Sequence, residues 1–298
     1  MDILILGGAG QVGTELQAIA WDADIRVHAP TRAELDATDE AALARAFAER
    51  AYGGIVNAAA YTAVDRAESD VAEAWRLNAL APALLAAQAA RAGIPLVHVS
   101  TDYVFDGTAS GPYEPDAPVN PQSVYGASKA AGEWAVRTAG PRHAIVRTAW
   151  VVSPHRGNFV KTMLRLAAER DRLAVVDDQR GCPTSARDLA EALAVIATRL
   201  ARDPGAPTGT FHCVNAGSTT WCGFARAILA GAARRGGRAV PVDAIPTSAY
   251  PTPARRPMNA QLSTASLSRA FGLAPRPWES ALDDILDRLV GPAERAGV

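Results

Sequence analysis

Short apolar runs alternate with segments of helical periodicity through the first half of the chain. The runs resemble strands buried on both faces of a parallel sheet, which read as near-continuous apolar stretches. The segments between them repeat apolar residues at helical spacing, most clearly over residues 70–93, where a proline lies inside a long predicted helix. The predicted strands are 2–6 (DILIL), 24–29 (DIRVHA), 54–60 (GIVNAAA), 95–105 (PLVHVSTDYVF) and 143–151 (HAIVRTAWV).

This alternation predicts an α/β fold built on a doubly wound parallel sheet, Rossmann-like, with its ligand at the carboxyl ends of the strands. After residue 150 the alternation gives way to loops such as SPHRGN, DDQRGCP and PTSAYPTPARRP. The segment TSARDLAEALAVIATRL then returns to helical periodicity behind a capping threonine or serine.

Composition narrows the class of protein. The 298 residues are 49% hydrophobic with a formal net charge of -1, so nothing favours a nucleic-acid partner. No apolar run is long enough to suggest a membrane span, and the start MDILILGGAG lacks the basic region of a signal peptide. The three cysteines are too few and scattered for a disulfide framework or zinc site. We expect a cytoplasmic, reduced protein.

A glycine-rich turn follows the first predicted strand. Gly7, Gly8, Gly10 and Gly13 fit two overlapping templates for a tight strand-to-helix turn. Such glycines let the backbone and the helix N-terminus approach a pyrophosphate. A merely flexible turn is the alternative, but the position between a strand and a helix favours dinucleotide binding.

The end of the second predicted strand bears on the choice of dinucleotide. Sites that prefer NAD usually place an acid there for the ribose hydroxyls. This chain has Thr31 and Arg32 instead, which suit a 2′-phosphate, and Asp36 lies farther into the loop, near the expected adenine. The sequence therefore favours NADPH, with NADH as an alternative; Arg32 as a solvated loop charge is the competing interpretation.

A tyrosine and a lysine four residues apart form the candidate catalytic pair. Of the 30 basic residues 28 are arginine, and Lys129, one of the two lysines, follows Tyr125 by one helical turn. An ammonium beside a phenol lowers the phenol's pKa, and a tyrosine tuned in this way can protonate a carbonyl during its reduction. A helix surface pair is the alternative, although arginine would serve it equally well.

Several motifs in order along the chain resemble the extended short-chain dehydrogenase/reductases, and more narrowly the dTDP-4-dehydrorhamnose reductase family. They are GGAGQVG, NAAAYTAVDRAE, STDYVFDG, VYGASKAAGE, RTAWV, NFVKTMLRLA, DQRGCPT, TTW and AYPTPARRPMNAQL. The resemblance implies reduction of the 4-keto group of dTDP-4-dehydro-L-rhamnose to dTDP-L-rhamnose by hydride from NADPH. In it Tyr125 donates the proton, Lys129 lowers the pKa of Tyr125 and binds the nicotinamide ribose, and Thr101 assists.

The resemblance also implies two lobes and two sets of binding residues. A dinucleotide-binding domain would span 1–150 plus about 184–215, and a substrate lobe mainly about 151–183 plus 216–298. The implied substrate residues are Thr101, Asp102, Trp150, Asn158 and Arg256. The implied cofactor residues are Gly7, Gly10, Gln11, Val12, Gly13, Thr31, Arg32, Asp36, Ala37, Ala60, Tyr61, Thr62, Val99, Tyr125 and Lys129.

Neighbouring residues separate this activity from related ones. Nucleotide-sugar dehydratases carry Asp-Glu after the threonine, whereas Asp102 is followed by Tyr103, so elimination lacks its base. Cys182 has no evident catalytic partner, and Arg187 stands where magnesium-binding, dimeric members carry an acid, which leaves magnesium and a homodimer open. Two alternatives also stay open: a reductase or epimerase of another nucleotide sugar, and a non-catalytic NADPH-binding regulatory subunit.

Overall fold

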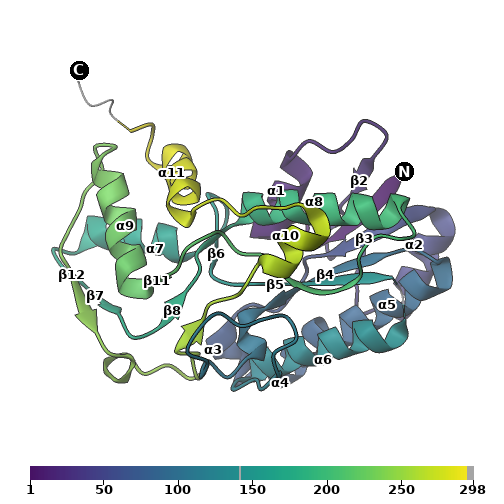
Figure 1. Ribbon diagram of the computed structural model, residues 1–298, viewed down its shortest axis with the longest axis horizontal. Coiled ribbons are helices and arrows are strands. Elements are labelled where there is room, and N and C mark those ends of the chain that lie inside the picture. Colours follow the sequence, from purple (N-terminus) through teal and green to yellow (C-terminus); the bar gives the residue numbers. More distant parts are fainter. Residues whose placement is uncertain (141, 294–298) are drawn as a thin grey trace.

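A parallel sheet of six strands forms the larger part of the molecule in the computed structural model, which describes residues 1–140 and 142–293 (Figure 1). The strand order is β10-β5-β4-β3-β1-β2, so the direction of winding reverses between β1 and β3. In such sheets a crevice opens at the carboxyl ends of the strands where the order reverses. The strands are β1 (Asp2–Leu6), β2 (Arg26–His28), β3 (Tyr52–Asn57), β4 (Leu96–Thr101), β5 (His143–Thr148) and β10 (Gly209–His212).

Helices cover both faces of this sheet, which confirms the predicted doubly wound α/β fold. On one face pack α1 (Gln11–Ala18), α8 (Ala186–Arg202) and α10 (Ala265–Phe271), joined by a core that includes Leu16, Leu193 and Phe271. On the other face lie α2 (Glu40–Glu49), α5 (Ala81–Ala92) and α6 (Val124–Ala139), whose core includes Leu43 and Val136. The strands are mainly apolar because both faces of the sheet are covered, although β4 buries His98 and β5 buries Arg147.

The helix predicted over residues 70–93 is interrupted by a π-helical turn. The structure has α4 (Val71–Trp75), a π segment (Arg76–Leu80) and then α5, with Pro82 in the first turn of α5. Proline lacks the N–H that would bond to the carbonyl of Asn78 four residues earlier. That carbonyl faces Gly132 of α6 instead, where an added Cβ would come within 2.1 Å of it. The proline thus shapes the contact between α5 and α6 rather than ending the helix.

Several predicted strands end earlier than expected. β2 stops at His28, and β3 stops at Asn57 before the run of alanines. β4 stops at Thr101 and a 3-10 turn, η2 (Asp102–Val104), follows it. The predicted strand 143–151 divides into β5 and the short β6 (Val151–Val152), because Trp150 between them adopts φ 49°, which no strand accommodates.

A smaller lobe with its own apolar core lies at one end of the sheet (Figure 1), and Phe224 and Trp278 are part of that core. Helix α10 comes from the C-terminal part of the chain, as Trp278 does, but it packs on the large sheet instead of the lobe. The exact domain boundaries stay a prediction. The remaining elements are α3 (Val64–Ala67), α7 (Phe159–Glu169), β7 (Leu173–Val176), β8 (Arg180–Gly181), β9 (Thr184–Ser185), β11 (Thr219–Thr220), α9 (Trp221–Ala233), β12 (Val242–Ile245), η3 (Thr247–Ala249), β13 (Asn259–Ala260) and α11 (Trp278–Leu289).

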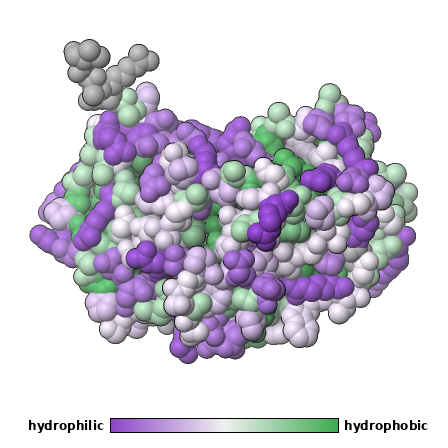
Figure 2. Space-filling view, in the orientation of Figure 1, coloured by the Kyte–Doolittle hydropathy of each residue, from purple (hydrophilic) through white to green (hydrophobic). Residues whose placement is uncertain are grey.

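Hydrophilic and hydrophobic residues are interspersed over the face of the molecule seen in Figure 2. Within residues 1–140 and 142–293, no helix combines the length and apolar character needed to cross a bilayer.

Candidate active site

The glycine turn connects β1 to α1 at the point where the strand order reverses. Gly7 has φ 81°, and an added Cβ would come within 2.6 Å of the Ala59 nitrogen at the end of β3. At Gly13 an added Cβ would come within 2.1 Å of the Gly7 carbonyl oxygen, so this glycine lets α1 pack onto the turn. Gly10 caps α1 without a side-chain hydrogen bond, which leaves the first N–H groups of the helix available to an anion.

A cavity of about 810 Å³ opens beside this turn and reaches the smaller lobe. It brings together nearly all the site residues expected from the sequence, from segments far apart in the chain. Two expected residues lie outside its lining: Gly13, which packs the helix, and Tyr61. The expected residues that line it are Gly7, Gly10, Gln11, Val12, Thr31, Arg32, Asp36, Ala37, Ala60, Thr62, Val99, Thr101, Asp102, Tyr125, Lys129, Trp150, Asn158 and Arg256.

Tyr61 supports the cavity wall through backbone hydrogen bonds with Asn78. Its backbone N–H donates to Asn78 Oδ1 at 2.8 Å, and Asn78 Nδ2 donates to the Tyr61 carbonyl at 3.1 Å. Asn78 Nδ2 also donates to Ser128 Oγ at 3.0 Å, and Ser128 donates to the Tyr125 carbonyl at 2.8 Å. The buried amide of Asn78 therefore ties the turn after β3 to the helix that carries Tyr125.

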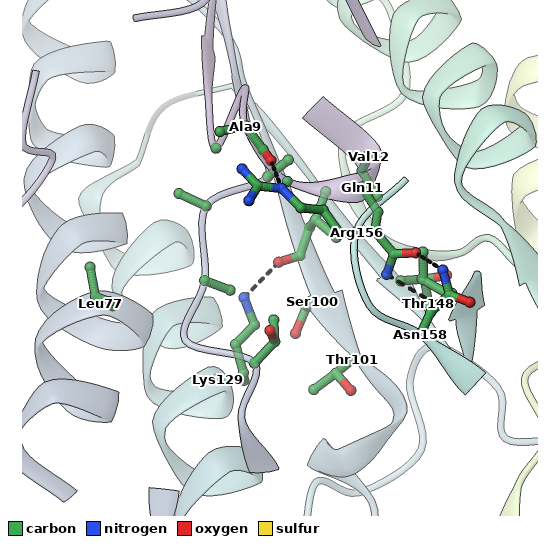
Figure 3. A pocket seen from close by; sticks show the side chains of 18 of the residues that line it. Ala9, Gln11, Val12, Leu77, Ser100, Thr101, Lys129, Thr148, Arg156 and Asn158 are labelled. Atoms are coloured by element: carbon green, nitrogen blue, oxygen red, sulfur yellow. Dashed lines mark hydrogen bonds between the residues drawn. The ribbon is translucent and has the colours of Figure 1, made fainter. Parts of the chain in front are cut away.

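Lys129 and Tyr125 lie on the buried face of α6 and line the cavity. Lys129 is only 2% exposed, and its Nζ donates to the Val99 carbonyl of β4 at 2.7 Å (Figure 3). Tyr125 packs edge-on against Tyr103, with ring centroids 5.4 Å apart. Thr101, at the end of β4, reaches both neighbours: it hydrogen-bonds Tyr125 and donates to Asp102 Oδ1 at 2.9 Å.

Burial governs the protonation of these groups. It raises the pKa of Tyr125 above the usual value, and the hydrogen bond with Thr101 only partly opposes this. Burial lowers the pKa of Lys129 to about 8, against the opposing charge of Glu133. That Lys129 lowers the pKa of Tyr125 stays a prediction, because burial sets the net direction of the shift and the Lys129 ammonium donates to the Val99 carbonyl.

Asp102 is a buried carboxyl at the same place. It is 3% exposed, and its Oδ2 has no hydrogen-bond partner in the described part of the chain. Burial raises the pKa of Asp102 to about 7, although its hydrogen bond from Thr101 acts in the opposite direction. A carboxyl of this kind changes charge near neutral pH, within reach of a bound ligand.

A buried ion pair fixes the strands and helix that carry the candidate catalytic residues Thr101, Tyr125 and Lys129. Glu133, one turn after Lys129 on α6, accepts two hydrogen bonds from Arg147 of β5, at 2.8 and 2.7 Å. Ser100, next to Thr101, donates to the same carboxylate at 2.6 Å. Because a paired, bidentate guanidinium fixes geometry as well as charge, this network holds α6, β4 and β5 in register.

The groups expected to bind a 2′-phosphate are already paired with acidic side chains. The N–H and hydroxyl of Thr31 both donate to Glu34, at 2.7 and 2.9 Å. Arg32 pairs with Glu73 at 3.3 Å and with Asp36 at 3.6 Å. A phosphate bound here would compete with these carboxylates for the guanidinium.

Two stacked tryptophans form the part of the cavity wall that belongs to the lobe. Trp150 lies on Trp221, with ring centroids 3.5 Å apart and planes 12° from parallel. Gly181 lies against Trp150, and an added Cβ there would come within 2.4 Å of the indole ring. Arg256 also lines the cavity, where it pairs with Asp65 at 2.6 Å and donates to the Tyr103 hydroxyl at 2.7 Å.

Asn158 serves the structure of the lobe as well as lining the cavity. Its Oδ1 caps α7 by accepting from the Lys161 N–H, and its Nδ2 donates to Gln11 Oε1 at 2.9 Å. The same Gln11 oxygen accepts from the Ser153 hydroxyl at 2.8 Å. Gln11 thus joins the glycine turn to the loop before α7.

Sequence reasoning missed two cavity residues of consequence, Arg156 and Trp221. Trp221 lies in the TTW motif, so its position in the resemblance was a usable signal. Arg156 lies in the loop SPHRGN, and only its place in the folded chain shows that it meets the glycine turn.

The acids nearest to Arg187 are engaged in ion pairs. Arg187 pairs with Glu191, and Asp188 with Arg276. Among residues 1–140 and 142–293 no group of three or more His, Cys, Asp or Glu side chains is placed to hold a metal ion. These residues do not fit a magnesium site. Cys182 is buried, and burial raises the pKa of its thiol.

Comparisons with known proteins agree over nearly the whole chain. The family model described as the RmlD substrate binding domain matches residues 1–290. A dTDP-4-dehydrorhamnose reductase of Burkholderia thailandensis is 46% identical over 295 residues, covering 95% of this chain and 97% of that protein. The crystal structure of a dTDP-4-dehydrorhamnose reductase from Clostridium acetobutylicum has a TM-score of 0.90 at 38% identity, covering 97% of this chain and 99% of that one. The Bacillus anthracis enzyme of that name, solved in complex with NADP, has a TM-score of 0.87 at 33% identity, covering 95% and 98%.

Proposed function

The chain belongs to the RmlD substrate binding domain family, and from this premise we propose that it is an NADPH-dependent dTDP-4-dehydrorhamnose reductase. It would reduce the 4-keto group of dTDP-4-dehydro-L-rhamnose to the hydroxyl of dTDP-L-rhamnose. The observation that carries the proposal is the convergence of Thr101, Tyr125 and Lys129 on one cavity with the glycine turn.

The cavity fits a dinucleotide on its Rossmann side. The uncapped N-terminus of α1 and the glycines before it suit a diphosphate, which needs N–H donors and close backbone approach. Ala60 and Thr62 line the wall after β3, and Asp36 and Ala37 line the adenosine end. A relative solved with NADP supports NADPH, which when bound supplies the hydride for the carbonyl carbon.

Three residues would then handle the carbonyl oxygen. Tyr125 is a neutral phenol at neutral pH because burial raises its pKa, so it holds the proton that the developing alkoxide needs. Thr101 would donate a hydrogen bond to the same oxygen once its hydroxyl has turned away from Asp102. Lys129, charged below a pKa of about 8, would stabilise the phenolate left on Tyr125 once the proton has moved.

The nucleotide sugar would occupy the side of the cavity toward the lobe. Trp150 offers an aromatic face for the sugar ring, and it is held in place by Trp221. Arg256 would bind the diphosphate of the substrate with a guanidinium fork, after exchanging part of its contact with Asp65. Asp102 and Asn158 would hydrogen-bond the sugar.

The test is turnover of dTDP-4-dehydro-β-L-rhamnose with NADPH, followed by nicotinamide absorbance and identification of the product. We expect one NADPH oxidised for each dTDP-L-rhamnose formed. Turnover of another nucleotide-linked 4-keto sugar in its place would reassign the substrate. Tight NADPH binding without turnover of any such sugar would favour a regulatory subunit.

A further inference from the structure

Arg156 reaches from the lobe across the cavity to the glycine turn. It lies in the loop between β6 and α7, and its Nε donates to the Ala9 carbonyl at 2.7 Å. Figure 3 shows the guanidinium next to Ala9, over the cavity that Lys129 also lines. The contact joins residues 147 positions apart, so it connects the two sides of the cavity.

The backbone at Arg156 is held in an unfavourable conformation. Its φ is 54°, and in the described residues Trp150 is the other non-glycine residue with positive φ. Side chains other than glycine, asparagine and aspartate rarely adopt this conformation, and glycine would adopt it without strain. An arginine kept at such a position next to a ligand cavity points to a use for its side chain.

The surrounding loop is fixed to the Rossmann side. The hydroxyl of Ser153 donates to Gln11 Oε1, and the His155 ring lies 2.9 Å from Glu15 Oε1 on α1. After Arg156, Asn158 Nδ2 also donates to Gln11 Oε1 at 2.9 Å, so contacts with the Rossmann side hold the loop before and after Arg156 in the chain. The guanidinium is therefore positioned before any ligand arrives, which lowers the entropic cost of binding.

The charge of Arg156 is also unpaired. The other arginines that line the cavity, Arg32 and Arg256, each pair with a carboxylate. Within residues 1–140 and 142–293 the Ala9 carbonyl is the one hydrogen-bond partner of Arg156, made through Nε, and no carboxylate pairs with it. Both Nη groups are thus free to bind oxygens of an anion.

We propose that Arg156 binds the diphosphate of the dinucleotide, on the side opposite the N-terminus of α1. Its anchor, Ala9, lies inside the turn that would hold the same diphosphate, whereas Arg256 lies with Tyr103 and Asp65 near the expected substrate. The inference rests on the proposed function in one respect, that a nicotinamide dinucleotide fills this cavity.

The test uses Arg156→Gly, because glycine accepts the backbone conformation while the whole side chain, with its guanidinium, is removed. Dissociation constants are measured by calorimetry for NADPH, NADH, dTDP and adenosine 2′-monophosphate, which lacks both phosphates of the diphosphate. Loss of a charge-assisted contact should weaken the binding of NADPH and NADH alike by roughly 10- to 150-fold. Binding of dTDP and of adenosine 2′-monophosphate should stay within about twofold of wild type, on the same scale.

Two further variants separate charge from folding. Arg156→Lys keeps the charge but loses the fork and the Ala9 anchor, so its NADPH affinity should fall between wild type and Arg156→Gly. Arg170→Ala, at the exposed end of α7, is the matched control and should bind NADPH like wild type. The thermal midpoint of Arg156→Gly should be no lower than that of wild type, since glycine relieves the strain.

Three results would overturn the inference: unchanged NADPH affinity in Arg156→Gly, weaker binding of dTDP instead, or equally weakened binding of NADPH and adenosine 2′-monophosphate. The second result would assign Arg156 to the diphosphate of the nucleotide sugar. A wild-type protein that fails to bind NADPH would overturn the proposed function itself, which distinguishes the two failures.

Discussion

Lys129 Nζ donates to the carbonyl oxygen of Val99 at 2.7 Å, and this bond places a buried ammonium at the carboxyl end of β4. The lysine is retained in a chain that otherwise uses arginine, with Lys161 as the one other exception. In the described residues its ammonium is buried with one hydrogen-bond acceptor, the Val99 carbonyl, which does not suit a guanidinium with five donors in a fixed plane.

Lys129→Arg should therefore lower kcat by about 10²-fold or more although the charge is kept, a loss in the range of a missing acid–base contribution. Steady-state kinetics with the dTDP-4-keto sugar would measure it. Lys161→Arg is the matched control, because Lys161 lies half-buried with its Nζ on the Pro154 carbonyl at 3.3 Å. Equal activity of the two variants would show that Lys129 is a structural residue.

Tyr125→Phe should lower kcat by about 10²- to 10⁴-fold, the usual contribution of a positioned acid. The phenyl ring keeps its contact with Tyr103, so NADPH affinity and thermal stability should change little. Tyr250→Phe, at a side chain 61% exposed, should be silent in the same assay. Turnover near wild type in Tyr125→Phe would remove the tyrosine from the mechanism.

Sequence patterns predicted those parts of the site whose residues lie close together in the chain. The glycine turn and the Tyr125–Lys129 spacing each lie within one or two turns of chain, so their geometry follows from the strand and helix they belong to. Arg156 was missed because its contact with Ala9 joins distant segments, and no periodicity reports such a contact.

The charge pairs at the adenosine end could not be predicted for the same reason. Glu73, 41 positions from Arg32, meets it only after α4 has packed beside the β2 loop. The burial that raises the pKa of Tyr125 could not be predicted either, because spacing reports a neighbouring charge but not the depth of burial.

Asp102→Asn should raise the free energy of unfolding above neutral pH. The carboxyl's pKa is about 7 in the folded chain against 3.8 without the fold, so the folded protein binds this proton more tightly. The stability that tighter binding of this proton gives the folded chain is fully present below pH 3.8 and is lost as pH rises through 7. At 1.36 kcal/mol per pKa unit, the variant should gain up to about 4 kcal/mol at pH 8.

Urea unfolding at pH 5 and pH 8 would measure this difference. The gain should be much smaller at pH 5, and Asp116→Asn, on an exposed loop, should show no pH-dependent gain. A variant less stable than wild type at pH 8 would mean that Asp102 is charged and stabilising in the folded chain.

Arg32→Ala should raise the KM for NADPH and leave that for NADH nearly unchanged. Loss of a charge-assisted contact with the 2′-phosphate should raise the KM for NADPH by roughly 10- to 150-fold. Competition from Glu73 and Asp36 for the guanidinium favours the lower end of this range. The effect should shrink at high salt because the side chain is exposed. Kinetics with both cofactors would check it, and an equal loss for both would assign Arg32 to loop structure.

Gly181→Ala should disturb the stacked tryptophans and weaken the binding of the nucleotide sugar. An added Cβ would come within 2.4 Å of Trp150, whose ring is already stacked on Trp221, so the pair must move. Overpacking of this kind costs about 1–3 kcal/mol, and the expected result is a lower thermal midpoint, altered tryptophan fluorescence and a higher KM for the sugar with little change for NADPH. Gly157→Ala is the matched control, because Gly157 lines the same cavity but an added Cβ there would have no atom within 4 Å. If both variants keep wild-type fluorescence and sugar KM, the Trp150–Trp221 stack does not form part of the sugar site.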